Sequence, residues 1–339
     1  MTRYRFVFLS FFCFFSAGLP PWAFDQIEED FSPTLRISEK DIENSYSAIK
    51  KEFRSASIEI VKVKVEGGSL FFSEDSPQSG AKLLHFKKSL SKALEGLSLP
   101  PFSFLLSLNK SFERPLFLRH LKVPIFAVSK HYKNQKVILL PNNCLKKEEF
   151  FEDSTPWSEK IPRALFVGEP SLKSNYYEWS LHPRAQLLFL KERLFPEVDG
   201  HFIQKDTFKL LPSHTQKSML GAKLFGPSLS EQELFHYRFL ISLDKETTSD
   251  ELPLFLYSKS CVLKERSPYI EWYDKGLIAF THYIPISSDF SDLNASIRSA
   301  TDGEFIAENG REFAEKYLSE EASTAYLREV FKAYSSRFE

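Results

Sequence analysis

The sequence is poor in glycine and cysteine and has no excess of charge of either sign. Its 339 residues include 12 glycines and 3 cysteines, and 44 lysines and arginines nearly balance 45 aspartates and glutamates. Scarce glycine argues against glycine-rich phosphate loops and against disorder, and balanced charge disfavours binding to a nucleic-acid backbone or an anionic membrane. So few cysteines cannot build a disulfide framework, and Cys144 and Cys261 form either one disulfide or two buried thiols.

Several well-known catalytic motifs are also missing. The chain has no Walker loop, no His-Glu-x-x-His helix, no Gly-x-Ser-x-Gly elbow and no Cys-x-x-Cys pair. It also has no Asp-x-Asp pair, which commonly holds a divalent cation against a diphosphate. We therefore expect a site without a metal.

The chain contains instead a large apolar and aromatic fraction. Hydrophobic residues make up 42% and aromatic residues 15%, with 34 phenylalanines, which is enough for two cores in a chain of this length. Strand and helix patterns alternate, so we predict an α/β protein with two domains. The patterns predict helices at 38–54, 86–97, 187–194 and 252–258, a hairpin turning at 67–68, strands at 102–108, 124–130, 137–141, 164–168, 239–243 and 261–263, irregular structure at 207–230, and a carboxy-terminal amphipathic helix.

The amino terminus has the layout of an export signal. Arg3 and Arg5 precede the apolar run 6–17, and a segment of small residues and prolines ends near Ala23. The run is short for a membrane span, and an uncleaved signal anchor is the alternative. We expect residues 1–23 to be this signal or anchor, and the protein to enter an endomembrane lumen or a bacterial envelope.

Residues 280–293, FTHYIPISSDFSDL, are predicted to be a strand that runs into a helix. Phe280, Tyr283 and Ile284 suit a buried strand, which Pro285 interrupts near its end. The short oxygen-bearing side chains at 287–292 suit the start of a helix. Open α/β sheets bind ligands at such strand-to-helix turns, so this stretch is a candidate binding crevice.

A series of segments in fixed order covers most of the chain. They are the hairpin around Gly67-Gly68, PIFAVSK (124–130), WSEKIPRALFVG (157–168), Arg184 with FPEVDGHF (195–202), HYRFLISLD (236–244), YSKSCVLKERSPYIEWY (257–273), THYIPISSDFSDL (281–293) and IAENGREF (306–313). Together they resemble glycosyltransferase family 90, the capsule-associated and protein O-glucosyltransferase group that also includes lipopolysaccharide-modifying enzymes.

The resemblance implies a GT-B-like α/β fold, in which two Rossmann-like domains face a central cleft and the carboxy-terminal helix packs back across. On this basis the chain divides into an acceptor-side domain (24–156), a nucleotide-sugar-side domain (157–318) and the final helix (319–339). It also implies transfer of a glucose- or xylose-type sugar from a nucleotide-sugar, such as a UDP-sugar, to a hydroxyl of a glycan, lipopolysaccharide or protein. The nucleotide-sugar is a co-substrate, so no other cofactor is implied. We expect no nucleic-acid partner, and membrane contact only through the amino-terminal segment.

The resemblance also places candidate site residues. Where the family has an aspartate before a proline, this chain has Glu113, the candidate catalytic base for the acceptor hydroxyl; the alternative is an exposed glutamate paired with Arg114. The alternative role of Arg184 is that of an ordinary surface residue, and the alternative role of Trp272 is core packing. His282 is expected to be a hydrogen-bonded core histidine and not a general base. The donor-binding candidates are Gly168, Arg184, Thr248 and Ser249, and the candidates at the acceptor side of the cleft are Lys130 and Trp272.

Two departures from the family pattern remove positive charge from the expected donor site. Val167 stands where the family has an arginine, and Glu251 stands where it has a second arginine in a turn that resembles a diphosphate clamp. Replacing attraction by repulsion at about 4 Å changes the interaction with a diphosphate by up to about 8 kcal/mol before screening, which Lys245, Lys173 or Arg184 would have to offset. Because an exported bacterial protein also lacks an ordinary nucleotide-sugar supply, the alternative is a catalytically degenerate member that binds a glycan or protein.

Overall fold

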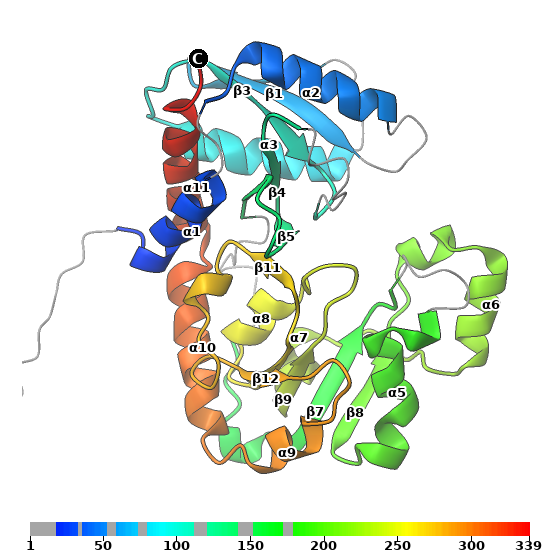
Figure 1. Ribbon diagram of the computed structural model, residues 1–339. Coiled ribbons are helices and arrows are strands. Elements are labelled where there is room, and N and C mark those ends of the chain that lie inside the picture. The colour runs from blue at the N-terminus through cyan, green and yellow to red at the C-terminus, as the bar shows by residue number, and fades with distance from the viewer. Residues whose placement is uncertain are drawn as a thin grey trace, which may run out of the picture.

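The chain folds into two α/β units, each built on its own five-stranded sheet, and Figure 1 shows one unit above the other. The computed structural model describes residues 18–32, 36–52, 59–73, 80–111, 121–141, 152–171 and 179–339. Strands of the first sheet lie between residues 60 and 139, and those of the second lie between 161 and 286. The predicted fold class, an α/β chain with two such units, is confirmed.

The first sheet combines an antiparallel hairpin with a parallel layer. Its strand order is β2-β1-β3-β4-β6, in which β1 pairs antiparallel with β2 and β3, whereas β3, β4 and β6 are parallel. The predicted hairpin turns at Gly67 and Gly68, whose φ angles of 57° and 77° suit glycine. The strands are β1 (Ile60–Glu66), β2 (Ser69–Phe72), β3 (Phe102–Ser107), β4 (Ile125–Ala127) and β6 (Val137–Leu139).

The first unit takes its helices from both ends of the chain. In the last helix, α11 (Glu320–Ser335), the Tyr334 hydroxyl donates to the carbonyl of Ser103 on β3 (3.0 Å), and Arg328 donates to the carbonyl of Glu95 (2.8 Å). The carboxy-terminal helix therefore packs back onto the first unit, as predicted. The other helices of this unit are α1 (Pro21–Phe31), α2 (Glu39–Glu52) and α3 (Gly80–Leu94).

Helix α1 begins inside the segment predicted as an export signal. Pro21 lies in its first turn, where a proline suits the start of a helix. The Trp22 ring packs 5.8 Å from that of Trp272, and Ala23 is fully buried. The predicted boundary after Ala23 thus falls within a packed helix. Within the described ranges no helix is long and apolar enough to span a membrane, and the run 6–17 lies outside them.

All strands of the second sheet are parallel, in the order β12-β10-β9-β7-β8. Parallel strands end at a common edge, and α-helices connect all consecutive strands of this sheet except β10 and β12. Cys261 on β10 is a buried free thiol, whereas Cys144 lies outside the described residues. The elements of this unit are β7 (Ile161–Gly168), α5 (Pro183–Leu194), β8 (Val198–Phe202), β9 (Tyr237–Ser242), α8 (Leu252–Tyr257), β10 (Cys261–Glu265), β12 (Ile284–Ile286), α9 (Leu293–Arg298) and α10 (Gly303–Tyr317).

A two-stranded ribbon joins the two units. β5 (Ser129–His131) of the first unit pairs antiparallel with β11 (Tyr269–Glu271) of the second. Figure 1 shows both strands at the junction of the units. The sequence predicted a single strand over 124–130, but the chain leaves the first sheet after β4. A pattern of residue types indicates a strand without indicating its partner, so the split was not foreseen.

The stretch 280–293 contains less strand than predicted. The strand β12 covers only Ile284–Ile286, and Phe280 is 65% exposed with a φ of 61°. The carboxylate of Asp292 accepts the backbone N–H of Ser287 (2.8 Å) and makes no cap to helix α9. The prediction of a strand from Phe280 was therefore wrong, because a residue with positive φ turns the chain.

The stretch 207–230 contains more helix than predicted. A 3₁₀ helix, η4 (Asp206–Leu210), and the α-helix α6 (Ser213–Gly221) lie there, and α7 (Glu231–Phe235) follows with a capping box between Ser230 and Glu233. The buried residues of α6 are Thr215 and Met219. So small an apolar face gives no clear helical periodicity in the sequence.

Candidate functional site

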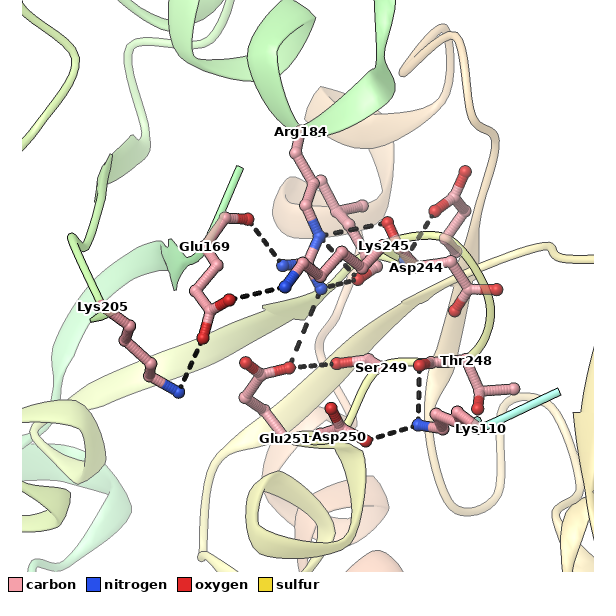
Figure 2. Close-up of polar contacts among 12 residues, drawn as sticks. Lys110, Glu169, Arg184, Lys205, Asp244, Lys245, Thr248, Ser249, Asp250 and Glu251 are labelled. Atoms are coloured by element: carbon pink, nitrogen blue, oxygen red, sulfur yellow. Dashed lines mark hydrogen bonds and ion pairs between the residues drawn. The ribbon is translucent and has the colours of Figure 1, made fainter. Parts of the chain in front are cut away.

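The candidate site lies at the carboxyl edge of the second sheet. β7 ends at Gly168, β8 at Phe202 and β9 at Ser242, and a polar loop follows each strand. Open α/β sheets bind their ligands at this edge. Figure 2 shows charged side chains from these three loops converging there, together with Arg184 from α5 and Lys110 from the first unit.

Arg184 is buried at this edge, with 2% of its surface exposed. Its Nε donates to the carbonyl of Leu243 (3.2 Å), its Nη1 donates to the carbonyl of Glu169 (2.9 Å), and Glu251 lies 3.7 Å from Nη2. A Cβ added to Gly168 would lie 3.1 Å from Nη1, so the glycine makes room for the guanidinium. The candidates Gly168 and Arg184 therefore lie together, and the arginine holds the ends of β7 and β9 against each other.

Thr248 and Ser249 lie in the loop after β9 and are almost fully buried. The Thr248 hydroxyl donates to the carboxylate of Glu271, and the Ser249 hydroxyl donates to that of Glu251 (2.7 Å). These two donor-site candidates are at the predicted edge, but their hydroxyls are engaged with carboxylates. Glu251, which stands at the place of a family arginine, is thus held by Ser249 and lies near Arg184.

Glu169 follows β7 directly, and three side chains contact its carboxylate. Its Oε1 lies 3.0 Å from Lys205 and its Oε2 lies 2.5 Å from Lys245, while the Thr207 hydroxyl donates to Oε2 (3.2 Å). Burial alone would raise the pKa of Glu169, but hydrogen bonds and charges from Lys245 and Lys205 outweigh it and lower the pKa. Glu169 is therefore an anion held between two lysines.

Lys110 reaches this edge from the first unit. It follows β3, and its Nζ lies 2.7 Å from the carbonyl oxygen of Thr248, 2.6 Å from the carboxylate of Asp250 and 3.0 Å from that of Glu271. Burial would lower the pKa of Lys110, but Glu271 and Asp250 raise it to about 12. The carboxyl end of β3 in the first sheet thus faces the carboxyl edge of the second sheet.

Asp244 begins the loop after β9, and its pKa is raised, whereas that of Glu169 is lowered. The Ser267 hydroxyl donates to its carboxylate, and its backbone N–H donates to Glu265 (2.9 Å). Burial raises the pKa of Asp244 to about 7, although the hydrogen bond from Ser267 and the charge of Lys264 act in the other direction. Asp244 is therefore partly protonated at neutral pH, in contrast to Glu169.

The two acceptor-side candidates are packing residues. Lys130 is 1% exposed and its Nζ lies 2.5 Å from the carboxylate of Asp30. Trp272 is 2% exposed and its ring lies 4.6 Å from that of Tyr326. Both side chains are enclosed by the fold, so their placement at the acceptor side of the cleft is corrected, and Trp272 has the packing role that was its alternative. The candidate base Glu113 lies outside the described residues.

His282 has structural partners, as the sequence predicted. Its Nδ1 accepts the backbone N–H of Ile278 (2.9 Å), and its ring lies 4.9 Å from that of Phe313 on α10. Burial lowers the pKa of His282, so the ring stays neutral at neutral pH. The histidine fixes the turn before β12.

The charged residues of the site that sequence reasoning missed include Glu169, Lys205 and Lys110. Each comes within three residues of the carboxyl end of a strand, β7, β8 or β3. That position is the signal that would have identified them, because parallel strands bring such residues to one edge. Lys245, which the sequence named as a compensating cation, lies at the edge, and Lys173 lies outside the described residues.

Comparisons with known proteins concern mainly the second unit. A family model, glycosyl transferase family 90, matches residues 143–339, which is more than half of the chain. Protein O-glucosyltransferase 2 of Danio rerio is 33% identical over 186 residues, and protein O-glucosyltransferase 3 of Homo sapiens is 26% identical over 189 residues. Each match covers 53% of this chain and 33% of the relative, so the chain spans about one third of their length. A solved glycosyltransferase from Rickettsia africae superimposes with a TM-score of 0.42 at 13% identity, over 68% of this chain and 69% of that one.

Proposed function

This chain belongs to glycosyl transferase family 90, and from that premise we propose that it transfers a sugar from a nucleotide-sugar to a hydroxyl group of a glycan, lipopolysaccharide or protein. The observation that carries the proposal is the family match over residues 143–339, which includes the whole carboxyl edge of the second sheet. The relatives' name, protein O-glucosyltransferase, favours glucose as the sugar, with xylose as the alternative. We take UDP as the nucleotide.

In this proposal the donor diphosphate lies at the second-sheet edge, and the acceptor approaches from the first unit. The acceptor oxygen attacks the anomeric carbon, its proton passes to a carboxylate, which we assign to Glu113, and the bond from the anomeric carbon to the diphosphate oxygen breaks. The nucleoside diphosphate leaves with the negative charge, which Arg184, Lys205 and Lys245 stabilise. In this proposal no reactant other than the donor and the acceptor takes part in the transfer.

Calorimetric titration with UDP and a panel of UDP-sugars, followed by a transfer assay, tests the proposal. We expect at least one UDP-sugar to bind and its sugar to be transferred to an acceptor. The variant Glu113→Gln is expected to bind the donor and to lose at least about 100-fold in transfer rate. Glu52→Gln, at the exposed end of α2, is the matched control and should keep full activity. If no nucleotide binds, the alternative of a silent glycan- or protein-binding member replaces the proposal.

We also propose that the amino-terminal segment directs the protein to a secretory compartment and provides its membrane contact. The sequence of residues 1–17 supports this, since two arginines precede an apolar run. Any processing would have to spare α1, which begins at Pro21 and packs Trp22 and Ala23 into the fold. Mass spectrometry of the mature amino terminus tests this point, and a chain that starts at Phe24 would contradict it.

A further inference from the structure

Two lysines from different loops meet at one carboxylate, that of Glu169 (Figure 2). Lys205 comes three residues after β8 and Lys245 three residues after β9, the two strands that flank β7 in the sheet. With the Thr207 hydroxyl, three donors surround a single anion. The oxygens of a phosphate accept charge-assisted hydrogen bonds from the same kind of donor set.

The charges at this point favour an anion larger than a single carboxylate. Two ammonium groups face one carboxylate, which leaves one positive charge unbalanced. The buried guanidinium of Arg184 does not change this balance, because the carboxylate of Glu251 lies 3.7 Å from its Nη2. A phosphate with two negative charges in place of the Glu169 carboxylate would balance both lysines, which a single carboxylate does not.

The Glu169 side chain can leave this position without moving the main chain. Its backbone carbonyl is held by Arg184 at 2.9 Å, and this bond to the end of β7 does not depend on where the carboxylate lies. The Lys205 side chain is 56% exposed, and solvent therefore reaches the contact. The pair with Lys205 is thus open to solvent, and such pairs contribute about 1 kcal/mol or less, so an incoming anion breaks this pair at little cost.

We propose that Lys205 and Lys245 form a phosphate-binding site that the Glu169 carboxylate occupies until the phosphate of a nucleoside diphosphate displaces it. Glu169 then acts as an internal competitor that sets the affinity of the site. The nature of the ligand rests on the proposed function, whereas phosphate binding by the two lysines does not.

Titration of the full chain with inorganic pyrophosphate and with UDP at low ionic strength tests the proposal. Glu169→Gln removes the competing charge but keeps the shape, and we expect it to bind both ligands at least about tenfold more tightly than the unmodified protein. Lys245→Gln and Lys205→Gln should each weaken binding by at least about tenfold. Asp206→Asn is the matched control: it removes a neighbouring carboxylate that pairs with Lys209, and should change affinity less than about twofold.

The outcomes separate this inference from the proposed function. Circular dichroism shows whether Glu169→Gln is folded. If the folded variant binds pyrophosphate no more tightly than the unmodified protein, this inference is overturned. If that variant does not fold, Glu169→Asp serves instead, because its shorter carboxylate cannot reach both lysines and affinity should still rise. If Glu169→Gln binds pyrophosphate more tightly but UDP no more tightly, the assignment of the ligand as a nucleoside diphosphate is overturned. If the unmodified protein transfers sugar but Glu169→Gln binds pyrophosphate and UDP no more tightly, only this inference is overturned. If Glu169→Gln binds both ligands more tightly but no sugar is transferred, only the proposed function is overturned.

Discussion

Two lysine–carboxylate contacts of this protein use the same chemical groups in opposite surroundings. Lys130 and Asp30 pair at 2.5 Å in the first unit, with side chains 2% and 0% exposed. Lys245 and Glu169 pair at the same distance in the second unit, but their side chains are 22% and 13% exposed, and Lys205, which shares the carboxylate, is 56% exposed. Dissolved anions reach the second contact and not the first. The difference separates a lysine that maintains the fold from lysines that are available to a ligand.

Removal of the buried carboxylate should have the largest effect on stability. Asp30→Asn leaves the ammonium of Lys130 in the core without a counter-charge, so we expect the free energy of unfolding to fall by about 3–5 kcal/mol. Glu169→Gln makes the same chemical change at the open contact and should cost less than about 1 kcal/mol. Urea unfolding of both variants measures the comparison. Equal losses would show that burial does not distinguish the two contacts.

Asp244 extends the comparison to a buried carboxyl at the edge that Glu169 also occupies. Its pKa is raised to about 7, so the folded protein binds a proton that the unfolded chain has released, and stability falls as pH rises from about 4 to about 7. Asp244→Asn removes this titration. We expect the variant to match the unmodified protein near pH 4 and to exceed it by up to about 4 kcal/mol at pH 8. A stability difference that stays constant with pH would contradict this expectation.

The contact between Lys110 and Glu271 is intermediate in exposure between the Lys130–Asp30 and Lys245–Glu169 contacts. The Lys110 side chain is 19% exposed and that of Glu271 is 3% exposed. Lys110→Met leaves the buried Glu271 carboxylate without this cation and removes a contact between the units. We expect a loss of about 2 kcal/mol in the free energy of unfolding, measured with urea. Lys64→Met, which breaks an exposed pair with Glu66 on β1, is the control and should cause no measurable change. If Lys110→Met and Lys64→Met lose similar amounts of unfolding free energy, Lys110 does not stabilise the junction of the units.

Local patterns predicted most elements, because short-range chemistry determines them. Ser38 and Asp41 exchange the hydrogen bonds of a helix start at α2, and the pair Gly67-Gly68 makes the hairpin turn. Phe280 was mistaken for a strand residue, because its aromatic type suits a strand whereas its backbone turns. The ribbon of β5 and β11 was missed because its strands are far apart in the chain.

The sequence predicted that some of the candidate residues lie near one another, but it did not predict their contacts. Gly168 and Arg184 lie at the expected edge, yet the carbonyl partners of Arg184 are 15 to 60 residues away in the chain, and no local pattern predicts them. Lys205 and Lys245 meet because β8 and β9 both flank β7. That strand order is a property of the whole sheet, so the sequence indicated Lys245 as a cation without showing that it shares a carboxylate with Lys205.

The ribbon of β5 and β11 joins the main chains of the two units. Its backbone hydrogen bonds tie one strand of each unit together, so the two units cannot separate there without breaking them. Side chains cross the same junction, because Lys110 pairs with Asp250 and Glu271 and the Trp22 ring packs on that of Trp272. Main-chain and side-chain contacts therefore together set the distance between the carboxyl edges of the two sheets.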